Sequence, residues 1–104
     1  MTLNRHDEAA TCYGKLISLY PGDFDNWNKR AVAYFLAGDL ENAKNTNVEF
    51  ISHFPVRDEP QIHQGNVFLA QGDTTQAMSY FKRALEINPS NAAFENHLKT
   101  LRIN

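Results

Sequence analysis

The residues of this 104-residue chain that could do chemistry are few, and they form no catalytic motif. We expect the one cysteine, Cys12, to be a structural or inert thiol, because the acidic residues Asp7 and Glu8 lie near it on the expected helix. The sequence also lacks a Gly-rich phosphate loop, an H-E-x-x-H helix and a C-x-x-C pair. We therefore predict that the chain is not an enzyme and needs no cofactor.

Three side chains that can carry a positive charge recur at a constant interval. Lys29, His63 and His97 are each 34 residues apart. No cysteine or carboxylate completes a ligand set with the two histidines, so we predict no metal site. If the helices that carry these residues lie about 8–10 Å apart, the three could form a row that attracts an acidic segment. We hypothesise that such binding is tighter near pH 6, where histidine becomes protonated.

Other residue types keep the same interval, which indicates an internal repeat. Glycine can take the positive φ that ends a helix, and the Asp that follows can cap the next helix. Proline prevents a second helix from continuing, and a small alanine lets two helix backbones approach. The recurring residues are Pro21, Pro55 and Pro89; Ala9, Ala43 and Ala77; and the pairs Gly38-Asp39 and Gly72-Asp73.

The repeat predicts an all-α protein of about six helices joined by short turns. Short connections make successive helices antiparallel neighbours. The expected helices are 5–19, 24–37, 40–53, 58–71, 74–87 and 91–103. The expected N-caps of the last five are Asp23, Asp39, Asp58, Asp73 or Thr74, and Ser90.

The stretch from Gly65 to Asn91 resembles a tetratricopeptide repeat (TPR), a 34-residue pair of helices. The residues that fit the spacing of the family are Gly65, Phe68, Ala77, Phe81 and Pro89 in this copy, and Trp27, Ala31 and Tyr34 in the copy before it. Four residues are polar where the family has apolar ones, and we expect them to weaken the inner packing. They are Arg30, Asn47, Gln61 and Gln64.

The resemblance covers nearly the whole chain and predicts a single TPR domain. Its parts are the second half of a repeat (1–23), two full repeats (24–57 and 58–91) and a C-terminal capping helix (92–104). A polar capping helix keeps a repeat array soluble. The first helix lacks the partner helix that a full repeat would supply.

Members of this family form right-handed α-superhelices, or α-solenoids, that bind peptides or protein segments in a concave groove. The resemblance therefore implies a scaffold or adaptor whose partner is a protein or peptide. The first helix of each repeat lines the groove in the family. Transferred to this sequence, the lining residues are Asn28, Lys29, Val32, Phe35, Ile62, His63, Asn66, Leu69, Asn96 and His97. Amide side chains among them could bond a peptide backbone. The alternative is a solvated face with no partner.

A second function is suggested by the unpaired first helix. Tyr13, Leu16 and Ile17 give it an apolar face, and burying three such side chains would contribute several kcal/mol, at ~1.5–3 kcal/mol each. The chain could therefore associate through this end with itself, as a homo-oligomer, or with a partner helix. A third possibility is that it is an enzyme-associated domain of a longer chain.

The composition argues against two other classes of partner, nucleic acids and membranes. A net charge of -2 and a pI near 6.0 argue against nucleic acid and against an anionic membrane surface. No apolar run approaches the ~20 residues of a membrane-spanning helix. A single cysteine excludes an internal disulfide, and we expect a cytoplasmic protein.

Overall fold

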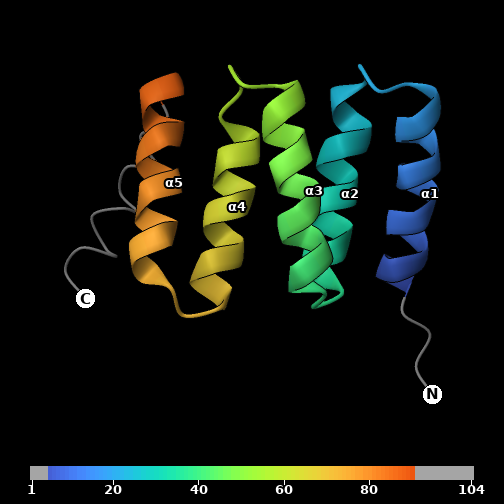
Figure 1. The fold of residues 1–104 in the computed structure, drawn as a ribbon, viewed down its shortest axis with the longest axis horizontal. Coiled ribbons are helices and arrows are strands. Elements are labelled where there is room, and N and C mark those ends of the chain that lie inside the picture. Colours follow the sequence, from blue (N-terminus) through green and yellow to red (C-terminus); the bar gives the residue numbers. More distant parts are fainter. Residues whose placement is uncertain (1–4, 91–104) are drawn as a thin grey trace. The chain divides into compact units, whose positions relative to one another are not determined.

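The computed structural model describes residues 5–90, and this part of the chain is helical without strands (Figure 1). The helices are α1 (Arg5–Leu19), α2 (Phe24–Leu36), α3 (Leu40–His53), α4 (Glu59–Ala70) and α5 (Thr74–Ile87). The first five expected helices agree with the observed bounds to within one residue at both ends, so the all-α prediction is confirmed. The sixth expected helix, 91–103, lies outside the described residues.

The Gly-Asp pairs end one helix and begin the next, as predicted. Gly38 has a φ of 77° and Gly72 a φ of 81°, a conformation that favours glycine. Asp39 accepts a hydrogen bond from the Asn42 backbone N–H, and Asp73 accepts one from the backbone N–H three residues on. These caps satisfy N–H groups that have no partner inside the helix.

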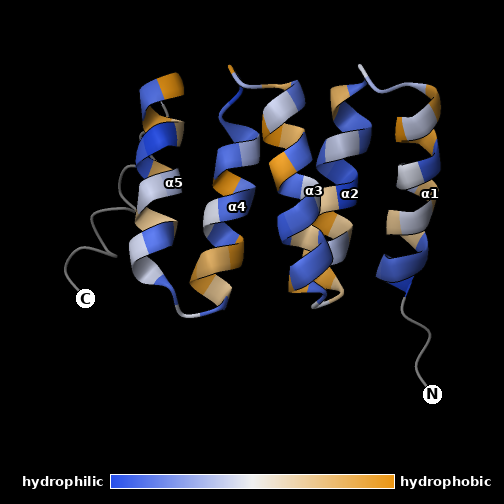
Figure 2. Ribbon diagram, in the orientation of Figure 1, coloured by the Kyte–Doolittle hydropathy of each residue, from blue (hydrophilic) through white to orange (hydrophobic). Residues whose placement is uncertain are grey.

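The described residues divide into two compact units, with the boundary between Phe54 and Pro55. In the first unit, α2 packs against both α1 and α3. Its core contains Ile17, Trp27, Ala31 and Phe50. The Trp27 ring stacks on Phe50 with centroids 6.1 Å apart, and its Nε1 donates a hydrogen bond to the Pro21 carbonyl at 2.9 Å. Hydrophobic residues alternate with hydrophilic ones along each helix, as in amphipathic helices (Figure 2).

In the second unit, α4 packs against α5 around Ala77 and Phe81. Gly65 is needed at this contact, because a Cβ atom there would lie 2.6 Å from Phe81 Cδ1. Ala77, like Ala43 in the first unit, is completely buried. Full burial is what a small residue at a close contact between helices requires.

Three of the four polar departures are buried, namely Asn47, Gln61 and Gln64. The fourth, Arg30, lies with its guanidinium against Gly14 of α1 and 5.5 Å from the centre of the Tyr34 ring. Within the described residues, the Nε of Arg30 and the Oε1 of Gln61 are buried without a hydrogen-bond partner. A buried polar atom without a partner costs about 1–3 kcal/mol, so the expected weakening at these two residues stays a prediction.

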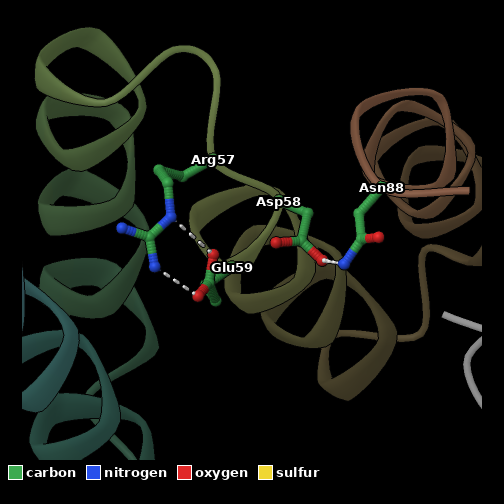
Figure 3. A network of polar contacts seen from close by, with 4 residues as sticks. All are labelled: Arg57, Asp58, Glu59 and Asn88. Atoms are coloured by element: carbon green, nitrogen blue, oxygen red, sulfur yellow. Dashed lines mark hydrogen bonds and ion pairs between the residues drawn. The ribbon is translucent and has the colours of Figure 1, made fainter. Parts of the chain in front are cut away.

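Asp58 does not cap α4 with its side chain, so that part of the cap prediction is wrong. Asp58 is the N-cap residue, but its backbone is in the αR region and Pro60 has no N–H to offer at the second helical position. The carboxylate instead accepts a hydrogen bond from Asn88 Nδ2 at 3.2 Å, at the end of α5 (Figure 3). Ser90, expected to cap the undescribed last helix, donates to Asn88 Oδ1 at 2.8 Å.

Candidate functional site

A cleft of about 340 Å³ lies between α1 and α2, within the first unit. Residues of α1 spaced by three or four positions form one wall, and residues of α2 form the other. The lining residues are His6, Ala9 and Tyr13 from α1, with Asn28, Lys29, Val32, Ala33 and Leu36 from α2.

The cleft combines an apolar surface with a cationic edge. Ala9 and Val32 are apolar and partly buried, and Leu36 is exposed. Lys29 is exposed, and its long side chain can follow an apolar surface while the ammonium remains in water. The arrangement suits an occupant with one or two apolar side chains and a carboxylate.

The structure brings together residues from two separate predictions. Asn28, Lys29 and Val32 were expected in the groove, and Tyr13 was expected on the uncovered face of α1. All four line the same cleft. Phe35, the other groove residue expected on α2, does not line it.

The remaining groove residues are on α4 or beyond it. Ile62, His63 and Asn66 are partly buried on α4. Leu69 packs against Ala77 and Phe81, the core pair of the second unit. Two further groove residues, Asn96 and His97, lie outside the described residues. A continuous groove across the repeats therefore stays a prediction.

The hypothesis that the groove binds an acidic segment more tightly near pH 6 requires His63 to be protonated at that pH. Burial lowers the pKa of His63 below the ordinary histidine value, although the negative charge of Glu59 acts in the opposite direction. The neutral ring therefore persists to a lower pH than in an exposed histidine. This argues against His63 as the source of tighter binding near pH 6.

The three residues of the predicted self-association face have different environments. Ile17 is buried and contributes to the core with Trp27 and Phe50. Leu16 is exposed, and Tyr13 is partly exposed at the cleft. The accessible part of the predicted face is therefore Tyr13 and Leu16.

The sequence prediction did not place His6, Ala9 or Leu36 at the site. The spacing along α1 could have identified two of them, because His6 and Ala9 precede Tyr13 by seven and four residues and therefore lie on the same side of the helix. That α2 supplies the opposite wall follows only from the packing of the two helices.

Other kinds of site receive no support from the described part of the chain. Among residues 5–90, no three His, Cys, Asp or Glu side chains are grouped so that they could hold a metal ion. None of the five described helices is both long and apolar enough to cross a membrane.

Comparison with known proteins places the chain among repeat proteins. Profiles of the tetratricopeptide repeat match residues 1–43 and 61–91. Two curated relatives are the human and mouse aspartyl/asparaginyl beta-hydroxylases, which are 32% and 29% identical to this chain over 72 residues. These 72 residues are 69% of this chain and 10% of each relative, so the match spans about a tenth of those proteins.

Solved structures share the fold at low sequence identity. The first TPR domain of Spaghetti (RPAP3), bound to the HSP90 peptide SRMEEVD, has a TM-score of 0.82 at 23% identity, covering 94% of this chain and 78% of that one. The Yersinia enterocolitica type III secretion translocator chaperone SycD, in an alternative dimer, has a TM-score of 0.86 at 14% identity, covering 95% and 80%. The repeat profiles, the helix pairs and these structures agree: the chain belongs to the tetratricopeptide repeat family.

Proposed function

We propose that this chain is a non-catalytic protein-interaction module that binds a peptide or protein segment in the cleft between α1 and α2. The observation that carries the proposal is the position of Asn28, Lys29 and Val32, three expected groove residues, around that one cleft. Val32 offers apolar contact, Lys29 offers charge, and an amide such as Asn28 has both a donor and an acceptor. The peptide held by the RPAP3 domain supports the same class of partner for this chain.

A peptide-binding experiment tests the proposal directly. A fluorescent peptide library is screened against the whole chain, and the best binder is titrated against Val32→Glu and Lys29→Ala. Lys82→Ala, on the exposed face of α5, is the control. We expect the two cleft variants to weaken binding about tenfold or more and the control to leave it unchanged. Binding that neither cleft variant alters would place the peptide elsewhere and reject the proposal.

A second candidate is assembly through α1. Leu16 and Leu19 in the last turn of α1 and Tyr20, which follows it, are 38%, 69% and 61% exposed. SycD, solved as a dimer, is a protein of the same fold that associates with itself. Light scattering over a range of concentrations tests this candidate, since a monomer at all concentrations would exclude self-association. Association with another protein's helix would remain.

A further inference from the structure

The repeat makes α1 equivalent to α3 and α5, because each is the second helix of a pair. Counting back 34 residues from Phe50 leads to Leu16, and counting forward leads to Ala84. Phe50 and Ala84 are buried, whereas Leu16 is 38% exposed. In the same way Ala43 and Ala77 are completely buried, whereas their equivalent Ala9 is only partly buried and lines the cleft. The side of α1 that contains Ala9 and Leu16 is therefore open where the same side of α3 and α5 is covered.

The structure also shows what covers this side in the complete pairs. On α3, the cover is α2: Trp27 stacks on Phe50, and Phe24 meets Phe54 edge to face with centroids 5.3 Å apart. On α5, the cover is α4, where Gly65 lies directly against Phe81. In both pairs the covering helix has an aromatic or a glutamine four residues before a small residue, Trp27 and Ala31 or Gln61 and Gly65.

The residues of α1 that correspond to the covered ones are apolar and accessible. Tyr13 is the equivalent of Phe81, and Tyr20 is the equivalent of Phe54. Tyr13 lines the cleft. Leu19, the last residue of α1, and Tyr20, which follows it, are exposed. The open side thus continues, one repeat earlier, the interface that α2 forms with α3 and that α4 forms with α5.

We propose that the occupant of this side is an α-helix of a partner protein with an aromatic residue four positions before an alanine or glycine. The small residue lies against Tyr13, as Gly65 lies against Phe81, and the aromatic residue packs on Leu16 and Tyr20. A carboxylate on the same helix pairs with Lys29, which borders the cleft. The inference rests on the proposed binding function of this cleft and specifies the conformation and pattern of the segment bound there.

A helix from a second copy of the chain suits the site less well. Within residues 5–90, the two helices with an aromatic residue four positions before an alanine are α2 (Trp27 and Ala31) and α5 (Tyr80 and Ala84). Both are already packed inside their own units, α2 against α1 and α3 and α5 against α4. A second copy could supply one of them only by unpacking its own core. A partner's helix that is not packed in a core of its own would bind without that cost.

The test uses a labelled peptide with the sequence of residues 23–36, which contains the aromatic–small pair Trp27 and Ala31 and the acidic Asp25. Binding to the whole chain is measured by fluorescence anisotropy, and helix formation by circular dichroism. Three altered peptides are compared: Trp27→Ala, Ala31→Leu and Arg30→Pro, the last being unable to form the helix. We expect each change to weaken binding about tenfold or more and binding to increase the helix signal.

Variants of the protein identify the face. Leu16→Asp places a charge on the open side of α1, and Val48→Asp places one on an exposed position of α3 as a matched control. We expect Leu16→Asp to abolish binding and Val48→Asp to leave it unchanged, with the helix content of both variants as in the parent. NMR shifts should change at Ala9, Tyr13 and Leu16, whereas changes centred on Phe50 would mean that the peptide had replaced α2 and would reject the inference.

The possible failures are distinguishable. If the Arg30→Pro peptide binds equally well and binding still depends on Lys29 and Val32, the site takes an extended segment. The helix inference is then wrong and the proposed function stands. If no peptide depends on Lys29 or Val32, the proposed function also fails. A dimer that Leu16→Asp dissociates would place a second copy on this side and reject a partner's helix.

Discussion

Asn88 Nδ2 donates a hydrogen bond to the Asp58 carboxylate at 3.2 Å, and so the end of α5 is tied to the start of α4 (Figure 3). The equivalent residues one repeat earlier are Phe24 and Phe54, whose rings pack edge to face. The same position in the fold is therefore held by a polar contact in one unit and by an aromatic contact in the other. Glu59, next to Asp58, instead pairs with Arg57 at 2.7 Å.

The first prediction concerns that polar contact. Asn88→Ala removes the donor and leaves the partly buried Asp58 carboxylate without it, which should lower the free energy of unfolding by about 1 kcal/mol. Ser90→Ala removes only the hydrogen bond from the Ser90 hydroxyl to Asn88 Oδ1 and should have a smaller effect on the free energy of unfolding. Urea unfolding measures both. Equal losses from the two variants would show that the Asp58 contact contributes nothing.

The second prediction concerns the close approach of α4 and α5. Gly65→Ala places a methyl group against Phe81, and the forced shift should lower the free energy of unfolding by about 1–3 kcal/mol. Alanine is the better helix former by about 1 kcal/mol, so a net loss would show that the contact dominates. Gly22→Ala, where no atom lies within 4 Å of the added Cβ, is the control.

Gly65→Ala should also be rescued by a second change. Replacing Phe81 with the smaller leucine removes the clashing ring edge. The double variant Gly65→Ala/Phe81→Leu should then lose less stability than the sum of the single variants. Strict additivity would contradict the direct contact between the two residues.

The third prediction concerns the buried amide of Gln61. Its Oε1 is buried without a hydrogen-bond partner among the described residues, where the family has an apolar residue. Gln61→Met keeps the length of the side chain and removes the unsatisfied atom, so the free energy of unfolding should rise by about 1–2 kcal/mol. Thermal and urea unfolding measure the change. A destabilised Gln61→Met variant would show that the amide makes a contact that stabilises the fold.

The fourth prediction concerns pH. Because the pKa of folded His63 is lowered by burial, the unfolded chain binds more protons below about pH 6.5. The contribution of His63 to stability is therefore complete above that pH and is lost as the pH falls toward the folded pKa. His63→Gln should reduce this loss between about pH 7.5 and 5.5. Urea unfolding of both proteins at each pH measures the difference, and parallel curves would contradict the burial effect.

Much of the fold could be predicted because the 34-residue period is a property of the chain alone. Gly38 and Gly72 end helices through a local backbone conformation. Asp39 and Asp73 each cap a helix by accepting a hydrogen bond from the backbone N–H three residues later. Such short-range chemistry requires no knowledge of distant residues. Asp58 shows the limit, since its carboxylate bonds to a residue thirty positions away, and no local rule favours that partner over the nearby backbone.

The sequence by itself determined the repeat, its helices and turns, and the family of the protein. The resemblance to the family identified Asn28, Lys29 and Val32 as groove candidates, and the apolar face of the first helix identified Tyr13. Only the tertiary structure decided that these four share a cleft, that Ile17 belongs to the core and that His63 is partly buried. The physical reason is that burial and proximity depend on which helix packs on which face, and residues far apart in the chain set that packing.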